Sequence, residues 1–289
     1  MRDGKTRRVG DPDDALDDLG ADPGADLGAD RKFVTSLARG LEILRAFRAG
    51  EHALTNQQLA ERTRLPKPTV TRLTYTLCAL GYLIYSEHKG AYQLGPGILG
   101  LGYSVLSSME MRERALPIMD DLARTPGVPA AVTVALAERH NLKAVYVAVR
   151  RAPQTVSLTL EVGARLPLGA SAVGRAILAS MHAPERELVL AELGRRYPEH
   201  DRTTRDNVAR AQVELATRGF VASFGDWKPE INGVAAPILS PDGERIFAMN
   251  VGGPAFLVSP QELEEKVGPR LALAARDLSL TRATPEAAS

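Results

Sequence analysis

The chain has 289 residues, 44% of them hydrophobic and 25% charged, and its formal net charge is +1. That length exceeds what one compact domain usually needs and suits two domains of ordinary size. The single cysteine, Cys78, excludes an intramolecular disulfide and any metal site that needs several thiolates from one chain. No run approaches the roughly 18 apolar residues of a membrane span, and the N-terminus lacks the layout of a secretory signal. We therefore expect a cytoplasmic protein with no membrane partner.

The charges are segregated along the chain. Residues 1–30 hold nine Asp against four basic residues, whereas residues 31–95 hold ten Lys or Arg against four Glu. Residues 96–289 balance 22 basic against 22 acidic residues. A cationic module beside a neutral one indicates that only residues 31–95 contact a polyanion, although an ordinary solvated basic surface would carry the same charge.

The two ends of the chain are expected to be tails. Residues 1–31 are rich in Asp, Gly and Ala and almost free of large apolar residues, so they cannot bury enough surface to offset the entropy of ordering. We expect a disordered acidic tail there, either an inert extension or a segment that competes with DNA phosphate. Residues 285–289 are expected to form a short C-terminal tail.

Structure is expected to begin at Phe33. Apolar residues then recur at intervals of four, three and three, which places them on one face of a helix. They are Leu37, Leu41, Leu44 and Phe47. Gly50 ends this helix, and Thr55 can cap a second one that carries Leu59 and Ala60.

A third helix follows a turn at residues 62–66, with Pro68 in its first turn. Its apolar residues are expected to face inward and recur at intervals of three, four and three. They are Val70, Leu73, Leu77 and Leu80. Gly81 closes the helix, and residues 82–85 and 91–94 form a hairpin around Gly90. Three helices and a hairpin predict a winged helix-turn-helix over residues 32–95.

The third helix leaves a polar face outside, with three hydroxyls, two cations and no carboxylate. These residues are Lys67, Thr69, Thr71, Arg72 and Tyr75. Such side chains can reach phosphates and base edges in a major groove, and Arg72 is the best candidate for a guanine. Any small helical domain would also have a polar outer face, but one without an acid is unusual. With Thr55 and Lys89 added, these residues are the predicted contacts to double-stranded operator DNA.

Residues 96–109 predict a short apolar linker helix, and residues 109–124 a helix with Leu116, Met119 and Leu122 inward. The linker is either a connector that also pairs with a second subunit or plain core of the second domain. A DNA-binding module of this size reads only a half-site, so two-fold symmetry is expected.

Residues 110–284 alternate strands and helices, which predicts a mixed α+β domain. The expected strands are residues 130–137 and 143–149, an antiparallel pair around a turn at 138–141, then 155–160, 233–239 and 246–251. The last two are hinged at residues 241–243. The expected helices are residues 172–180, 184–193, 205–218 and 260–281, the third ended by Gly219.

Catalytic and metal-binding motifs are absent from the sequence. Gly95–Gly100 fits GxGxxG, but the strand before it is a short hairpin arm and Pro96 lies inside the glycine turn, which argues against a dinucleotide site. The five histidines are scattered without metal-ligand spacing, and no nucleophile–base pair is recognisable. We expect no enzyme activity, no cofactor and no metal, and a packing role for Cys78.

One stretch of the second domain is typical of a binding site. In residues 163–179 a loop of small residues leads into a helix, where the backbone N–H groups of Ala172, Val173 and Gly174 are expected to be free. The helix dipole there favours an anion such as a metabolite carboxylate. Equally, the small residues can serve close packing on the sheet, with Ser171 capping the helix.

Five ordered motifs resemble the IclR family of bacterial transcription regulators. They are SLARGLEIL (36–44), LPKPTVTRL (65–73), YQLGPG (92–97), RLPLGASAVGR (165–175), and GVAAP (233–237) with GGP (252–254). The resemblance covers about residues 33–280. It implies a winged helix-turn-helix, a linker helix and an α+β effector domain related to GAF and PAS sensors. It also implies a homodimer or dimer of dimers on palindromic operators, often repressing operons for catabolism of small organic or aromatic acids.

The resemblance further implies an effector site. Ala172 and Val173 inherit the role of backbone donors to an anion. The remaining implied lining comprises a far wall of Ser223, Gly233, Asn250 and Gly252, and apolar contacts from Leu158 and Leu166.

Two positions depart from the family pattern. After Gly219 and Phe220 the family commonly has a run of acidic residues, whereas residues 221–227 read VASFGDW and Ser223 replaces the expected acid. Gly233 stands where other members can carry Cys or a larger residue. These departures favour a bulkier, less polar guest, such as an aromatic or hydroxylated acid.

The predicted function is a sequence-specific repressor of a catabolic operon, whose operator binding is modulated by a small carboxylate effector. One alternative is a constitutive DNA-binding regulator whose C-terminal domain only oligomerises. Another is an enzyme tethered to DNA, which would need a nucleophile, base and metal that the sequence does not present together.

Overall fold

A computed structural model describes residues 32–48, 50–124, 131–151, 160–240 and 242–280. The expected tails, residues 1–31 and 285–289, lie outside the described residues. The chain divides into one unit over residues 1–108 and another over residues 109–289, and each is described by itself. None of the described helices is long and apolar enough to cross a membrane.

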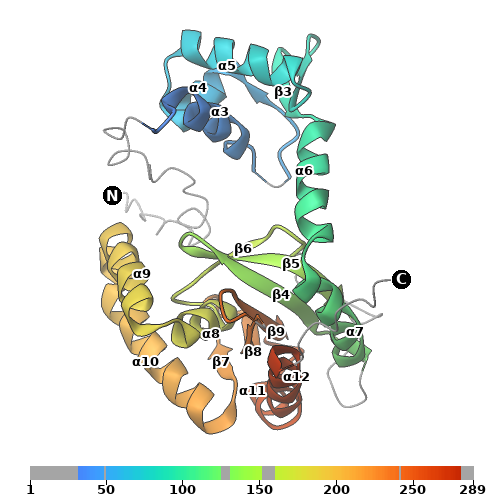
Figure 1. Cartoon of the computed structure of the whole chain (residues 1–289), viewed down its shortest axis with the longest axis vertical. Coiled ribbons are helices and arrows are strands. Elements are labelled where there is room, and N and C mark those ends of the chain that lie inside the picture. Colours follow the sequence, from blue (N-terminus) through green and yellow to red (C-terminus); the bar gives the residue numbers. More distant parts are fainter. Residues whose placement is uncertain (1–31, 49, 125–130, 152–159, 241, 281–289) are drawn as a thin grey trace, which may run out of the picture. The chain divides into compact units, whose positions relative to one another are not determined.

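The first unit consists of helices with a three-stranded sheet of order β1-β3-β2 (Figure 1). Its elements are α3 (Thr35–Arg45), β1 (Leu54–Thr55), α4 (Asn56–Thr63), α5 (Lys67–Ala79), β2 (Leu83–Ser86), β3 (Ala91–Leu94) and α6 (Pro96–Ser107). Thr55 caps α4 through a capping box with Gln58, and Gly90 adopts the left-handed conformation that the hairpin turn requires. The predicted winged helix-turn-helix is confirmed, and the short strand β1 is an addition to it.

The predicted inward faces of the first and third helices are partly wrong. Leu37 is 64% exposed, Leu41 45% and Leu80 63%, whereas Ile43 is fully buried. Leu80 lies at the C-cap of α5, where the chain turns back at Gly81 and Leu83 takes the core position instead. The polar Thr74 is also buried on α5. Its burial leaves no unpaired hydroxyl, because the hydroxyl donates to the Val70 carbonyl of the same helix.

Helix α6 has no buried residue. It falls within the first unit, residues 1–108, which favours the connector over plain core of the second domain. Leu99, Leu101 and Tyr103 are all more than half exposed, so the role of a connector that pairs with a second subunit stays a prediction.

The second unit is built on a six-stranded antiparallel sheet of order β6-β5-β4-β9-β8-β7. Its strands are β4 (Thr133–His140), β5 (Lys143–Arg151), β6 (Arg165–Pro167), β7 (Val221–Phe224), β8 (Ile231–Leu239) and β9 (Ile246–Pro254). Its helices are α7 (Glu110–Arg124), α8 (Ala172–Ser180), α9 (Ala183–Arg196), α10 (Asp201–Arg218), α11 (Pro260–Glu262) and α12 (Gly268–Leu280). A 3₁₀ turn (Pro198–His200) precedes α10, and a π-helical turn (Leu263–Val267) separates α11 from α12.

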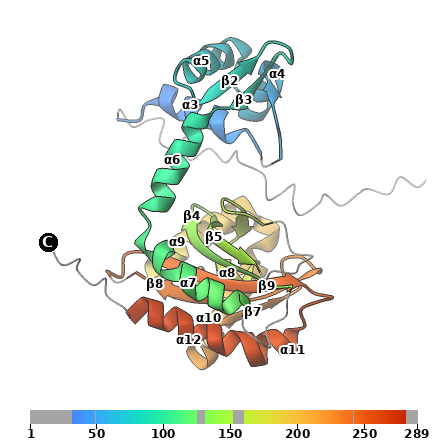
Figure 2. The same ribbon diagram turned by 90° about the vertical axis from the view of Figure 1, so that its right-hand side faces the viewer.

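The sheet lies between two helical layers. Helix α8 packs on one face with α10 behind it, and α7 and α12 cover the other face (Figures 1 and 2). The strands present small side chains to α8: Ala135, Ala137, Ala144, Ala235 and Ala248. These alanines let the helix approach the sheet closely, and they leave the larger polar residues of the same face to gather near the start of α8.

Several predicted element boundaries in the second unit need correction. Residues 138–140 belong to β4, so the turn is at Asn141 and Leu142, with Asn141 left-handed. Strand β6 falls where the sequence predicted a loop, and β7 follows Gly219 and Phe220 where no element was predicted, because three- and four-residue strands are too short to show a period. The single terminal helix is interrupted by the π turn. The strand predicted over residues 155–160 lies almost entirely outside the described residues.

Candidate DNA interface and ligand cavity

The outward face of α5 carries the predicted DNA contacts. Lys67, Thr71, Arg72 and Tyr75 are exposed, Tyr75 by 77%, and Thr69 is half-buried. Val70, Thr74 and Leu77 fix the rotation of the helix because they are buried on its other side. The arrangement presents guanidinium, ammonium and hydroxyl groups to one side, as major-groove recognition requires.

A groove runs between α3 and α5. It is lined by Thr35, Ser36, Arg39, Thr69, Thr71, Arg72, Leu73, Tyr75 and Thr76. The lining contains two arginines and no carboxylate, so it suits phosphate contact. Helix α3 contributes Thr35, Ser36 and Arg39 to this groove, which the sequence did not predict. The absence of an acidic residue from the first turn of α3 is a sequence feature that indicates phosphate contact. It was not used because the sequence predicted the wrong buried face for this helix.

Two of the predicted contact residues are also engaged in the protein itself. The Thr55 hydroxyl accepts from the Gln58 backbone N–H as the cap of α4. The Thr71 hydroxyl donates to the Lys67 carbonyl and accepts from Asn56 Nδ2 at 3.0 Å. Lys89 is exposed in the hairpin turn. Both hydroxyls therefore help to orient α4 and α5, and their contact with DNA stays a prediction.

An ion pair ties α4 to the segment after α3. Arg62 donates to both carboxylate oxygens of Glu51, at 2.6 and 2.7 Å, and to the Ala46 carbonyl at 2.8 Å. The hydrogen bond from Arg62 lowers the pKa of Glu51 to about 2.

Cys78 lies partly buried against the hydrophobic core of the first unit. Burial raises the pKa of its thiol, which favours a packing role.

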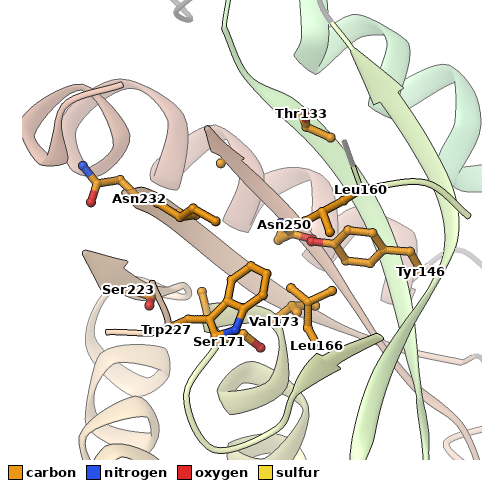
Figure 3. A pocket seen from close by; sticks show the side chains of 14 residues that line it. Thr133, Tyr146, Leu160, Leu166, Ser171, Val173, Ser223, Trp227, Asn232 and Asn250 are labelled. Carbon is orange, nitrogen blue, oxygen red and sulfur yellow. The ribbon is translucent and has the colours of Figure 1, made fainter. Parts of the chain in front are cut away.

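The second unit contains a cavity whose floor is one row across the sheet. The antiparallel register sets Thr133, Gly252, Gly233 and Ser223 side by side on β4, β9, β8 and β7, and all four line the cavity (Figure 3). A Cβ on Gly233 would meet its nearest heavy atoms at 3.5 and 3.7 Å, whereas one on Gly252 would meet the Asn232 carbonyl at 2.8 Å. Gly252 is therefore required by close packing, while the site of Gly233 could accept a methyl group with ordinary contacts.

The start of α8 forms the opposite wall. Ala172 and Val173 line the cavity, and first-turn N–H groups have no partner within their own helix. The expectation that Gly174 also offers a free N–H is wrong, because it donates to the Ser171 hydroxyl at 3.1 Å. A Cβ on Gly174 would lie 2.4 Å from Leu168 Cα, so this glycine serves close packing. Close packing thus accounts for Gly174, and anion binding at Ala172 and Val173 stays a prediction.

The predicted effector residues within the described part of the chain all line this one cavity. They are Leu166, Ala172, Val173, Ser223, Gly233, Asn250 and Gly252; Leu158 lies outside the described residues. The lining further includes Thr133, Tyr146, Leu160, Ser171, Trp227, Ile231 and Asn232, which sequence reasoning missed. Strand register and the segments next to the strands bring most of these together, and apart from Ser171, which lies in the small-residue stretch, no local motif indicates them.

Two of the missed residues supply aromatic walls. Tyr146 is buried, which raises the pKa of its phenol, and its oxygen is hydrogen-bonded by Asn250. Trp227, after the end of β7, projects its indole into the cavity near Val173 and Leu166 (Figure 3). The walls are therefore mostly apolar with a few polar groups, as in small-molecule sites generally.

A buried ion pair anchors the segment that carries Trp227. Arg175 on α8 is fully buried, and its Nη2 donates to Asp226 at 2.8 Å and to the Ala222 carbonyl at 2.9 Å. Burial lowers the pKa of the guanidinium, and Asp226 opposes that effect. Ser223 replaces the acid expected in this segment, but Asp226, three residues later, still supplies a carboxylate, which faces Arg175.

Among the described residues, no group of His, Cys, Asp and Glu side chains could hold a metal ion. The geometry of the two units offers surface recognition in the first and enclosure of a small guest in the second.

Comparisons with known proteins match both units. The IclR helix-turn-helix domain matches residues 36–86, and the bacterial transcriptional regulator IclR C-terminal domain matches residues 103–280. The HTH-type transcriptional regulator TsaQ1/TsaQ2 of Comamonas testosteroni is 32% identical, over 85% of this chain and 87% of that protein. The Pca regulon regulatory protein of Pseudomonas putida is 30% identical, over 86% and 84%.

Among solved structures, an IclR family transcriptional regulator from Brucella abortus superposes with a TM-score of 0.77 at 41% identity, covering 86% of this chain and 93% of that one. The relatives are named as transcription regulators and not as enzymes, so the tethered-enzyme alternative is set aside. Its two domains and its relatives thus show that this chain belongs to the IclR family of DNA-binding transcription regulators.

Proposed function

We propose that the chain is a ligand-responsive repressor that acts as a homodimer or dimer of dimers. The observation that carries the proposal is the cavity at the start of α8, where the free N–H groups of a helix N-terminus meet polar side chains from the sheet. Names of relatives such as the Pca regulon and glycerol operon regulatory proteins support control of an operon.

In this proposal the exposed face of α5 reads the operator. Arg72 contacts a base edge, Lys67, Lys89 and Arg39 contact phosphates, and Thr69 and Tyr75 support the same face. One module of this size covers a half-site, so two copies bind a palindrome. Effector binding changes the affinity for the operator by favouring one placement of the two modules.

The proposed effector is a small organic acid whose carboxylate binds at Ala172 and Val173. The cavity encloses about 40 Å³, well below the roughly 300–1,000 Å³ of typical ligand pockets. An aromatic acid therefore requires part of the cavity wall to move. A homolog from Microbacterium hydrocarbonoxydans was solved as a complex with 4-hydroxybenzoate (24% identity, TM-score 0.65, 84% of this chain and 98% of that one). That likeness extends to the fold alone, and the effector proposed for this chain follows from its own cavity.

The test is a titration of operator binding with acids. DNA fragments retained by the full-length protein are sequenced, and affinity for the recovered site is measured by fluorescence anisotropy with and without candidate acids. The proposal expects at least one acid to weaken binding about tenfold or more. Unchanged affinity across the panel would favour the constitutive regulator, and tighter binding would identify an acid-dependent DNA binder in place of a repressor relieved by its ligand.

A further inference from the structure

Three buried polar atoms at the cavity have no hydrogen-bond partner among the described residues. They are Thr133 Oγ1, Asn250 Oδ1 and Trp227 Nε1. Thr133 is only 4% exposed, and all three residues line the same cavity. Unpaired buried polar groups are costly and uncommon, so three around one cavity indicate that a guest completes them.

The three atoms fall into two groups. Thr133 and Asn250 are diagonal neighbours on adjacent strands, since Thr133 pairs with Gly252 and Asn250 pairs with Ala135. Both residues lie on the same face of the sheet and line the cavity, as diagonal neighbours within reach of a shared guest. In Figure 3 the indole nitrogen of Trp227 lies on the side of its ring nearer Ser171, at the start of α8, while Thr133 and Asn250 lie on the other side.

The two groups demand different chemistry. An indole N–H is only a donor, and it lies at the helix end whose free N–H groups are also donors, so that end suits a carboxylate. The free atom of Asn250 is an amide oxygen, which is only an acceptor, and Thr133 can donate or accept. A plain carboxylic acid leaves the Asn250 oxygen unpaired, whereas a hydroxyl group satisfies both.

We propose that the effector is a hydroxy acid, its carboxylate held by Trp227 Nε1 and the start of α8, its hydroxyl read by Asn250 and Thr133. The hydroxyl donates to Asn250 Oδ1 and accepts from Thr133 Oγ1. This inference rests on the proposed function, and it adds the second functional group of the guest and the residues that select for it.

The structure also shows which contacts hold the side chains of Asn250 and Trp227 in place. Asn250 is oriented by its hydrogen bond to Tyr146, a fully enclosed ring. Trp227 follows Asp226, which is anchored by Arg175, and the Lys228 ammonium lies 5.3 Å from the centre of the indole ring. Both ends of the cavity are therefore preorganised for a guest of fixed orientation.

The test uses matched acids that differ by one hydroxyl. Binding to the full-length protein is measured by titration calorimetry for propionate against lactate, and for benzoate against 3- and 4-hydroxybenzoate. We expect the hydroxy acid of at least one pair to bind tenfold or more tightly than its partner. Thr133→Val and Asn250→Leu should reduce that ratio to threefold or less.

Trp227→Phe separates the two ends, because it removes the indole N–H and keeps an aromatic wall. It should weaken both members of the pair by a similar factor, about fivefold or more, and leave their ratio unchanged. Thr217→Val is the matched control, since Thr217 is exposed on α10 and its hydroxyl bonds only to its own helix among the described residues. It should change neither affinity nor ratio.

The outcomes distinguish this inference from the function on which it rests. If acids bind and modulate the operator complex equally with and without a hydroxyl, the hydroxy-acid proposal fails and the repressor proposal stands. If folded Thr133→Val and Asn250→Leu proteins still prefer the hydroxy acid, these two residues do not bind the hydroxyl and their assignment is overturned. If no acid in the panel binds or alters operator affinity, both proposals fail.

Discussion

The two candidate recognition regions of this chain place their polar groups in opposite surroundings. On α5, Arg72, Lys67 and Tyr75 are exposed, so water satisfies them whenever DNA is absent. At the cavity, Thr133 is buried and the polar atoms of Asn250 and Trp227 are enclosed without a partner among the described residues. Loss of an exposed group therefore costs only its contact with the target. Loss of a buried partner also costs stability, because the group left behind stays desolvated.

The largest expected effect lies in the buried region. Asp226→Ala removes the carboxylate that faces the fully buried Arg175. We expect the free energy of unfolding of the second unit to fall by about 3 kcal/mol, because an uncompensated buried charge remains. Trp227 is the only tryptophan of the chain, so its fluorescence during urea titration reports on this unit.

The exposed pair Arg202–Asp206 on α10 supplies the control. Its side chains are 96% and 74% exposed and 3.9 Å apart, so Asp206→Ala should cost well under 1 kcal/mol. Equal losses for the two variants would show that the burial of Arg175 carries no special cost.

On the exposed region, Arg72→Ala is expected to weaken operator binding by about 1–3 kcal/mol while leaving the unfolding free energy unchanged. The reason is that Arg72 projects from the helix without contributing to its core. Fluorescence anisotropy with the operator measures the loss, and Arg202→Ala on the second unit is the matched control. An unaltered affinity would mean that another face of α5 enters the groove.

The contrast also explains what the sequence could predict. The face of α5 follows from the spacing of Val70 and Leu77 within a single helix, so the exposed contacts could be named from local periodicity. Leu37 and Leu41 were misassigned because periodicity defines a face but does not say whether anything covers it. Both residues are exposed, and Ile43 is the buried one.

The cavity depends on register between distant strands. Thr133 and Ser223 are 90 positions apart in the sequence but lie in one row with Gly252 and Gly233 between them. Family resemblance supplied part of that row, including Ser223 and Gly233, which stay predicted effector contacts. Resemblance to the family did not point to Trp227 or Thr133. These two residues stand out only in the structure, because each has a buried polar atom without a hydrogen-bond partner among the described residues.

A smaller effect tests the open wall of the cavity. In Gly233→Ala the added Cβ meets only ordinary contacts at 3.5 Å and beyond, so the fold should be retained and acid affinity should fall by about 1–2 kcal/mol through filling of the site. Gly252→Ala is the contrasting variant, because its Cβ would lie 2.8 Å from the Asn232 carbonyl. It should lose stability as well, measured by the same urea titration. Unchanged acid affinity in Gly233→Ala would place the guest away from this wall.

The smallest expected effect concerns the ion pair between Glu51 and Arg62 in the first unit. The stability that this pair contributes depends on pH. Glu51 is paired with Arg62, and the pKa of its carboxyl is lowered to about 2 from an ordinary value of 4.5. A lowered pKa in the folded state means that the pair stabilises the first unit above about pH 4.5 and that this contribution is lost as the pH falls toward 2. Glu51→Gln should therefore cost about 1 kcal/mol at pH 7, since solvent screens a pair near the surface, and the difference from the unchanged protein should vanish near pH 2. Hydrogen exchange of the α4 amides measures it, and a difference that persists at low pH would show that Glu51 acts through its shape and not through its charge.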